Sequence, residues 1–146
     1  MKIVVQRAKN ASVKVDGNII GEINKGYVLF IGFTLDDNEE LLDKMADKVV
    51  NLRIFEDDNE KMNYDIKDVN GSILSISQFT LYAKLDGRRP SFSNAMKYNE
   101  AKRLYELFNK KLKERNINVQ TGEFGSDMKV ELLNDGPVTI IIDSNE

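Results

Sequence analysis

The sequence contains neither cysteine nor histidine. Without them the chain cannot form a Ser-His-Asp triad, a Cys-His nucleophile, a disulfide scaffold, or a metal site built from thiolates or imidazoles. The acidic run Asp57–Glu60 also lacks the ligand spacing and the glycine of an EF-hand. We therefore expect no metal and no cofactor. Any catalysis must use hydroxyls, amides, carboxylates, Lys, Tyr, backbone groups or the substrate itself.

Long apolar runs are absent as well, since no stretch of about 18 apolar residues occurs. The N-terminus passes from Met1–Lys2 directly into Ile3–Arg7, without the pattern of a signal peptide. We therefore expect a soluble, cytoplasmic protein that does not bind membranes. With 146 residues, positions 1–146 fit a single domain built around one core.

The spacing of apolar residues predicts the elements of the fold. Asp16–Gly17 indicates the turn of an opening hairpin, and Asp37 with Glu40 is typical of a capping box at a helix start. Residues 57–71 are predicted to form a loop. We expect helices at 38–52 and 94–114, and strands at 2–15, 19–23, 27–33, 53–56, 72–83, 119–122, 127–133 and 138–142. The predicted class is α+β, with an antiparallel, barrel-like sheet and two main helices.

Charge is unevenly distributed along the chain. Residues 36–60 hold ten acids and three bases, a net charge of −7, whereas residues 84–115 hold ten bases and four acids, a net charge of +6. A polyanion could approach the basic segment and be repelled by the acidic one. Two solvated helices of opposite sign explain the same pattern more simply. Tyr98, Tyr105 and Phe108 share a helical face with leucines, which predicts core positions rather than a base-stacking surface.

Two stretches do not fit a purely structural role. The predicted strand 72–83 places Ser75, Ser77, Gln78 and Thr80 among Ile, Leu and Phe, although a strand buried on both faces is usually a nearly continuous apolar run. The second stretch is Asn134–Thr139, where Asp-Gly alone would indicate a tight hairpin turn. The proline that follows removes a backbone donor at the start of the next strand, so carbonyl oxygens there can face outward.

Ser77–Leu81 and Asn134–Thr139 resemble the two signature motifs of the D-aminoacyl-tRNA deacylase family, also called D-tyrosyl-tRNA deacylases. The resemblance extends along the whole chain, through Val4–Arg7, Ala11–Val13, Arg89–Phe92 and Phe124–Gly125. It implies an enzyme that hydrolyses the ester of D-aminoacyl-tRNA and so proofreads chirality in translation, with tRNA as its partner.

The resemblance further implies a homodimer whose active sites lie at the interface between two barrel-like subunits. A cis Gly136–Pro137 bond of one subunit faces the pocket of the other, and Arg7 supports the Gly-Pro loop. The pocket and catalytic residues of the first subunit are then Ser77, Gln78, Phe79 and Thr80.

The chemistry can be judged without the family. The aminoacyl ester is already activated, so orienting water and stabilising the oxyanion with backbone amides near Phe79 and Thr80, at about 3 to 4 kcal/mol per donor, could suffice. No histidine is available to accept a proton from Thr80, which favours a positioning role over a nucleophilic one. The ribose 2′-hydroxyl next to the ester could activate the water.

Selectivity for D-amino acids follows from shape. Rigid carbonyls at Gly136 and Pro137 can accept the substrate ammonium and occupy the volume that an L side chain needs. Glycine has no side chain to exclude, so we expect glycyl-tRNA, including glycine mischarged on tRNA-Ala, to be a substrate.

Two alternatives remain open. A non-catalytic, dimeric nucleic-acid-binding module could use the basic segment; its phosphate-facing residues would be Lys84, Arg88, Arg89, Lys97, Lys102 and Arg103. The first three are also the predicted tRNA contacts of a deacylase. The other alternative is a structural dimer in which Ser77 and Thr80 only satisfy internal hydrogen bonds.

Overall fold

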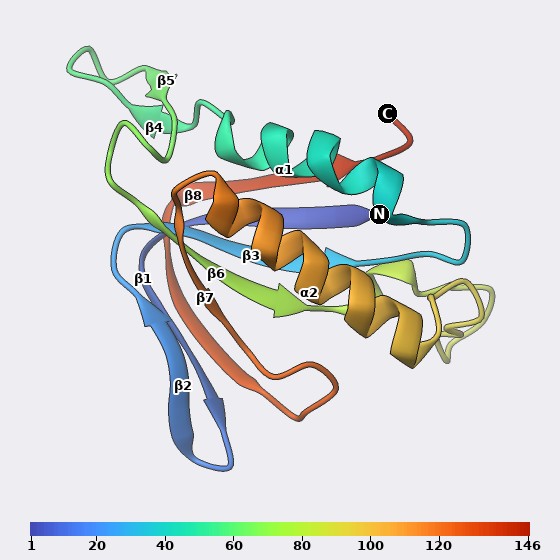
Figure 1. Cartoon of the computed structure of the whole chain (residues 1–146). Coiled ribbons are helices and arrows are strands. Elements are labelled where there is room, and N and C mark those ends of the chain that lie inside the picture. The colour runs from blue at the N-terminus through green and yellow to red at the C-terminus, as the bar shows by residue number, and fades with distance from the viewer.

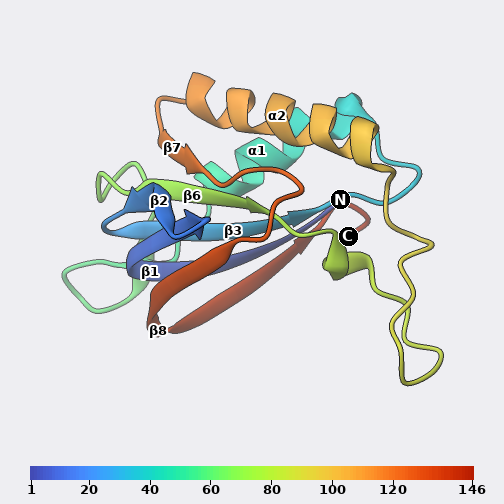
Figure 2. The same cartoon turned by 90° about the horizontal axis from the view of Figure 1, so that it is seen from below.

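The computed structural model describes all of residues 1–146. Its main body is a strongly curved, six-stranded sheet with two helices on one side of it (Figures 1 and 2). The strands of this sheet are β1 (Lys2–Val15), β2 (Asn18–Ile23), β3 (Gly26–Gly32), β6 (Ser72–Ser77), β7 (Asn118–Thr121) and β8 (Lys129–Asp143). The other elements are the 3₁₀ turns η1 (Glu39–Leu41) and η2 (Phe79–Tyr82), the helices α1 (Leu42–Val50) and α2 (Tyr98–Glu114), and a small hairpin of β4 (Phe55–Glu56) and β5 (Met62–Tyr64).

The sheet is mixed, so the prediction of an antiparallel sheet is only partly right. β1 pairs antiparallel with β2, β3 and β8, whereas β6 pairs parallel with both β3 and β7. The parallel pairs arise because α1 lies between β3 and β6 in the chain, and α2 lies between β6 and β7. A helical crossover returns the chain to the same end of the sheet, where the next strand can run parallel. The two helices and the barrel-like sheet are confirmed.

The sheet closes almost completely into a barrel. The first half of β1 pairs with β3 and the second half pairs with β2, while β8 follows both halves with register shifts that bend the pair. β2 thereby approaches β7, on the other side of the gap. A Cβ atom at Gly21 would lie 2.9 Å from the Thr121 carbonyl oxygen, so only glycine permits this approach.

Apolar residues form two cores, one on each face of β3 and β6. The larger cluster fills the space between the sheet and the helices and includes Tyr27 and Leu29 of β3. The smaller one lies inside the curved sheet and includes Val28 of β3 and Leu74 of β6. The continuous apolar run of β3 is therefore buried on both faces, as predicted.

β6 ends at Ser77, so the prediction of one strand from Ser72 to Ala83 is wrong in its second half. The last ladder bond joins the Gln78 amide to the Ile31 carbonyl at 2.7 Å, next to the end of the partner strand β3 at Gly32. Without a continuing neighbour, the chain turns into η2, where the Leu81 amide donates to the Gln78 carbonyl at 3.2 Å. The alternation of faces expected for a strand therefore stops before Thr80.

The Asn134–Pro137 stretch is a bulge within one long strand, and the interpretation as a hairpin turn is wrong. Both halves of β8 pair with the same strand, Asn134 opposite Ala8 and Thr139 opposite Gln6. Residues 135–138 therefore stand opposite Arg7 alone. A hairpin turn would have paired the two halves with each other.

The helix starts differ from the predictions. The side chain of Asn38, not Asp37, caps η1 by accepting the Glu40 amide, and α1 begins at Leu42. Asp37 instead accepts the Thr34 amide at 2.8 Å and contacts the N-terminal ammonium of Met1 at 2.6 Å. α2 begins at Tyr98 rather than at residue 94, and β5 lies within the predicted loop 57–71. Neither helix has the length and the apolar character needed to cross a membrane.

The oppositely charged segments face each other across the two helices. Arg103, Lys111 and Arg115 of the basic segment reach acids of the other: Glu39 at 3.0 Å, Asp43 at 3.0 Å and Asp47 at 2.9 Å. Hydrogen bonds from Lys111 and Arg115 hold the pKa of the Asp43 carboxyl below its usual range. Much of the charge asymmetry is therefore neutralised within the fold, although exposed ion pairs of this kind add little to stability.

Replacing Asp37 should destabilise the fold strongly. Its side chain is only 7% exposed and its partner ammonium is fully buried, so Asp37→Asn leaves a buried charge without its counter-ion. We expect the free energy of unfolding to fall by about 3 kcal/mol in urea denaturation. The control Asp86→Asn removes an exposed carboxylate and should change it by less than about 0.5 kcal/mol. Equal effects of the two variants would contradict this role of Asp37.

Candidate active site

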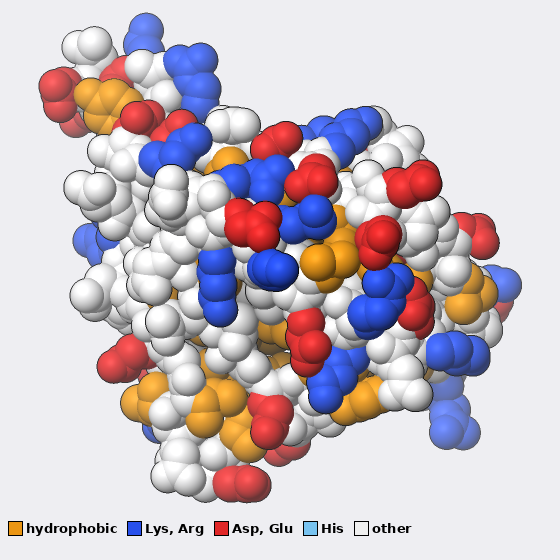
Figure 3. Space-filling view, in the orientation of Figure 1, with side chains coloured by type: hydrophobic (Ala, Val, Ile, Leu, Met, Phe, Trp, Pro, Cys, Tyr) orange, Lys and Arg blue, Asp and Glu red, His pale blue; other side chains and the backbone are white.

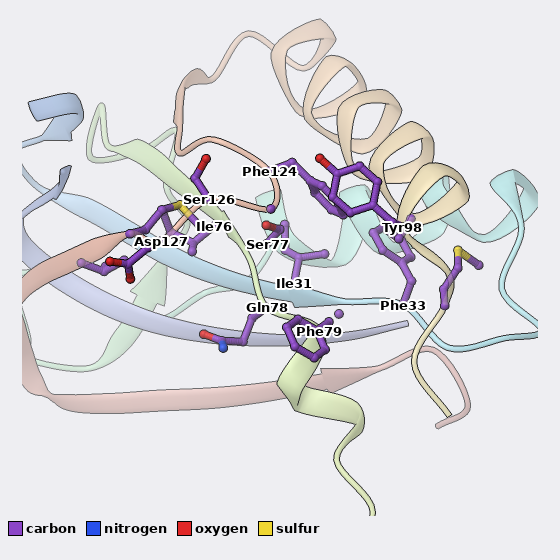
Figure 4. A pocket seen from close by; sticks show the side chains of 16 residues that line it. Ile31, Phe33, Ile76, Ser77, Gln78, Phe79, Tyr98, Phe124, Ser126 and Asp127 are labelled. Atoms are coloured by element: carbon purple, nitrogen blue, oxygen red, sulfur yellow. The ribbon is translucent and has the colours of Figure 1, made fainter. Parts of the chain in front are cut away.

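A pocket of about 500 Å³ opens where β3 and β6 end (Figure 4). Its walls come from Ile31–Phe33, Ile76–Phe79, the segment from Met96 to Ala101, and Phe124–Val130. Because β3, β6 and β7 run parallel, their carboxyl ends meet at this edge, which is where open α/β sheets usually bind ligands. The volume lies within the range of small-molecule sites.

Three of the four predicted catalytic residues line this pocket: Ser77, Gln78 and Phe79. The Ser77 hydroxyl, at the end of β6, has no hydrogen-bond partner in the chain. The Gln78 amide nitrogen donates to the Thr80 hydroxyl oxygen at 2.5 Å, which links Thr80 to the pocket from just outside it. The Phe79 ring packs edge-on against Phe92 at 4.9 Å and is 58% exposed.

Ser75 serves a different purpose from the other polar residues of its stretch. It is fully buried, and its hydroxyl donates to Asn109 of α2 at 2.6 Å. Its carbonyl accepts the Tyr105 hydroxyl at 2.7 Å and the Gly122 amide at 3.2 Å. Ser75 therefore joins β6 to α2 and to the chain after β7. Its polar groups serve internal hydrogen bonds, whereas the Ser77 hydroxyl is not used in this way.

Aromatic side chains form the wall opposite Gln78 (Figure 4). Tyr98 and Phe124 pack edge to face at 5.1 Å, and Phe33 lies beside them in the lining. The prediction that Tyr98 is a core residue is wrong, because it is 55% exposed at the first position of α2, whereas Tyr105 and Phe108 are buried as predicted. The predicted helix start at residue 94 placed Tyr98 inside the helix, so the sequence carried no signal that separated it from the other two.

The pocket offers no general base next to Thr80. Its titratable side chains are Tyr98 and Asp127, and the Asp127 carboxylate contacts the Lys129 ammonium at 3.0 Å. Gln78 is the only side-chain partner of Thr80, and it donates to the hydroxyl oxygen. The Thr80 hydrogen is thus free to donate, and nothing is positioned to remove it. Sequence reasoning missed Asp127, which no motif marked.

The Gly136–Pro137 pair lies elsewhere on the chain. Both residues are exposed on the β8 bulge, their peptide bond is cis as the resemblance implies, and neither lines the pocket. Gly136 has a φ of +153°, and a Cβ atom there would lie 2.6 Å from a methyl carbon of Val138 and 2.7 Å from its amide nitrogen. No other residue fits this position without displacing the backbone.

Two side chains clamp the bulge. Arg7 is 5% exposed; its Nε donates to the Asp135 carbonyl at 2.8 Å and its Nη1 to the Ile54 carbonyl at 2.6 Å. The Asn134 amide closes the bulge from within, because its Oδ1 accepts the Val138 amide at 2.8 Å and its Nδ2 donates to the Val138 carbonyl at 3.2 Å. The contact expected between Arg7 and the Gly-Pro loop is therefore present.

The predicted tRNA contacts lie on a separate loop. Lys84 and Ser91 exchange backbone hydrogen bonds at 2.7 and 2.9 Å, which closes residues 85–90 into a projecting loop that carries Arg88 and Arg89 (Figure 2). All three basic residues are exposed, and none lines the pocket. Lys84, Arg88 and Arg89 therefore share one loop, and this loop is not part of the pocket that the predicted catalytic residues line.

Comparison with known proteins identifies the family of this chain. The family model described as D-Tyr-tRNA(Tyr) deacylase matches residues 4–143. The chain belongs to this family. Among relatives in this family, the D-aminoacyl-tRNA deacylase of Bacillus cytotoxicus is 52% identical over 145 residues, 99% of each chain. That of Clostridium botulinum is 55% identical over 147 residues, 100% of this chain and 99% of the relative.

Two solved structures share the fold of this chain. A c-Myc DNA unwinding element binding protein is 39% identical, covers 98% of both chains and superposes with a TM-score of 0.92. A probable eukaryotic D-amino acid tRNA deacylase has a TM-score of 0.84 over 97% of both chains, but at 16% identity it supports the fold alone. The family resemblance noted in the sequence is confirmed.

Arg7→Lys should destabilise the protein. A lysine cannot reproduce the forked contacts to the Asp135 and Ile54 carbonyls from a buried position. We expect the free energy of unfolding in urea to fall by about 2 to 4 kcal/mol. Arg53→Lys is the matched control, because Arg53 bonds Asn63 at the surface and should change stability by less than about 0.5 kcal/mol. A loss no larger than that of the control would exclude a clamp by Arg7.

Proposed function

We propose that the protein hydrolyses the ester bond of D-aminoacyl-tRNA and releases the D-amino acid. The observation that carries this proposal is the position of Ser77, Gln78 and Phe79 at the mouth of a pocket in a chain of the D-Tyr-tRNA(Tyr) deacylase family. The relatives that are about 50% identical over the full chain are named D-aminoacyl-tRNA deacylases.

Catalysis would work by positioning. The first amides of η2, from Phe79 and Thr80, have no partner within that turn and can stabilise the oxyanion of the attacked ester. Thr80 accepts a hydrogen bond from Gln78, so its own hydrogen can orient the ester carbonyl or the attacking water. The ribose 2′-hydroxyl can activate that water, which removes the need for an enzyme base. The absence of a base beside Thr80 supports this role over a nucleophilic one.

The proposed active form is a homodimer in which the Gly136–Pro137 bulge of one copy covers the pocket of the other. Three observations support it. The bulge is rigidly clamped yet lines no part of its own pocket. β8 pairs only with β1 and so keeps a free edge along its length, which proteins rarely leave uncovered. Phe79, Leu133 and Ile141 are each more than half exposed.

Chiral selection would come from that covering bulge. The carbonyls of Gly136 and Pro137 would accept the substrate ammonium and fill the volume on the side where an L side chain would project. The clamps from Arg7 and Asn134 support this role, because exclusion by clash requires a wall that does not yield. D-Amino acids of many sizes would be accepted, and glycyl-tRNA would be hydrolysed as well.

The tRNA would be held on two surfaces. The aromatic wall of Phe33, Tyr98 and Phe124 suits the terminal adenine, since aromatic rings bind nucleobases by stacking. Lys84, Arg88 and Arg89 on the projecting loop would contact phosphates.

A binding protein without catalysis is the second candidate, favoured by one observation. The solved relative at 39% identity carries the name of a DNA unwinding element binding protein. However, Arg103 of the basic surface required by this candidate is engaged with Glu39 and Glu100.

Hydrolysis of charged tRNA tests the proposal. We expect the purified protein to release D-tyrosine from D-tyrosyl-tRNA and to leave the L-ester largely intact, because the covering Gly136–Pro137 bulge would exclude the L side chain. Released amino acid is measured over time at matched enzyme concentrations. Equal rates on both esters would contradict chiral selection, and tight tRNA binding without ester cleavage would favour the second candidate.

Two substitutions separate positioning from nucleophilic catalysis. Thr80→Ala removes one positioning hydrogen bond and should lower kcat/KM by about tenfold. Gly136→Val displaces the bulge and should lower it by about a hundredfold or more. Both variants are first checked for folding by circular dichroism. The reverse order of the two losses would indicate that Thr80 is the nucleophile.

A further inference from the structure

A second cleft lies beside the pocket, on the other side of Phe124. It has a volume of about 470 Å³ and runs between α2 and the chain that follows β7. Phe124 lines both hollows and packs against Tyr98 on one side and Tyr105 on the other. Most of the residues that line this cleft are polar, whereas most of those that line the pocket are hydrophobic. Figure 3 shows Lys and Arg side chains around a hollow next to α2.

Three lysines border the cleft: Lys102, Lys110 and Lys113. None of them forms an ion pair, although Arg103, Lys111 and Arg115 on the neighbouring face of the same helix all pair with acids. The three free ammonium groups are therefore available to an anion. Two carboxylates share the cleft, Glu106 and Glu123, and the second of these already accepts the Ser126 hydroxyl at 2.5 Å.

A buried amide also lines this cleft. Asn109 is only 6% exposed, and its Oδ1 accepts the Ser75 hydroxyl at 2.6 Å. The same side chain is in hydrogen-bond contact with the Tyr105 hydroxyl, and its NH₂ group carries two hydrogens, so one of them remains for a ligand. The Ser75 and Tyr105 hydroxyls both contact this amide and hold it in place. A cleft that combines the buried amide of Asn109 with unpaired lysines is suited to an oxygen-rich ligand.

We propose that this cleft binds the nucleotide that precedes the terminal adenosine of the tRNA substrate. The inference rests on the proposed function, because the order of surfaces then matches the order of groups in the substrate. The ester lies at Gln78 and Phe79, the adenine at the aromatic wall, and the next nucleotide beyond Phe124. The lysines contact its phosphates, while Asn109 and Glu106 hydrogen-bond its base or its 2′-hydroxyl.

The weak net charge of the cleft fits this assignment. The three lysines and two glutamates give the cleft a net charge of +1. This charge is too small to support sequence-independent binding of RNA by electrostatic attraction alone. A nucleotide tethered to an adenosine in the adjoining pocket is presented at a high effective concentration, so modest contacts suffice. The carboxylates also discourage unrelated polyanions from occupying the cleft.

The test compares two substrates with two triple variants. One variant replaces the cleft lysines (Lys102→Gln, Lys110→Gln, Lys113→Gln), and its control replaces exposed lysines elsewhere (Lys14→Gln, Lys44→Gln, Lys61→Gln), so both lose the same charge. The substrates are D-tyrosyl-tRNA and D-tyrosyl-adenosine, which has the same ester without the preceding nucleotide. Rates are measured at several salt concentrations.

We expect the cleft variant to lose about tenfold in kcat/KM on D-tyrosyl-tRNA and to retain its rate on D-tyrosyl-adenosine. The slope of log kcat/KM against log salt concentration should become less negative by about 2 in this variant, because each lost phosphate contact removes about 0.7 from the slope. The control variant should change less than about twofold on either substrate.

Equal losses on both substrates would overturn the assignment, because the cleft would then act on the pocket and not on the nucleotide. Equal losses of kcat/KM in the cleft variant and its control would attribute the effect to the overall charge of the protein and would also overturn the assignment. No loss in either variant would show that the cleft lysines bind no part of the substrate. If the proposed function itself were wrong, the unmodified protein would cleave neither ester, which none of these outcomes resembles.

Discussion

The pocket and the Gly136–Pro137 bulge are fixed on different strands of one curved sheet, and the bulge lines no part of the pocket. This separation is the constraint on which the account depends. Arg7 and Asn134 hold the bulge rigidly, so it cannot fold over its own pocket without breaking their hydrogen bonds. In the proposed homodimer, the two motifs of the D-Tyr-tRNA(Tyr) deacylase family would be two halves of one site, and a second copy of the chain would unite them.

The ends of the parallel strands β3 and β6 determine which groups the pocket can offer to a substrate. Because β3 stops at Gly32, β6 loses its neighbour, and the chain turns into η2 directly after Gln78, which lines the pocket and bonds Thr80. With no histidine in the chain, that arrangement can orient an activated ester but cannot deprotonate a hydroxyl. In the proposed function, shape would supply the selectivity and the substrate would supply the reactive group. The buried hydrogen bond from Ser75 to Asn109 fixes β6 against α2, and so holds the strand end that carries Ser77 and Gln78.

Much of the fold could be predicted from periodicity, and the errors have identifiable causes. The buried strand β3 and most of α2 follow from apolar spacing. The mixed sheet was missed, although the predicted helices 38–52 and 94–114 each lie between two predicted strands and so allow parallel crossovers. Their order in the chain does not by itself say which strands become neighbours. Asp37 was predicted to cap a helix, but the N-terminal ammonium of Met1 is a partner that lies far away in the sequence. The motifs identified Ser77–Phe79 and Gly136–Pro137, yet Asp127 and Tyr98 join the pocket only through tertiary packing.

The most direct test of a site shared between two copies is complementation between two inactive variants. One variant carries Gln78→Ala with Thr80→Ala, and the other carries Gly136→Ala; the two are co-expressed with different tags, and the mixed dimers are purified. A shared site predicts that each mixed dimer regains one intact site of two, and so about half of the unmodified activity on D-tyrosyl-tRNA. If mixed dimers form but stay as inactive as the two parents, each site would lie within one chain, and the account would be wrong.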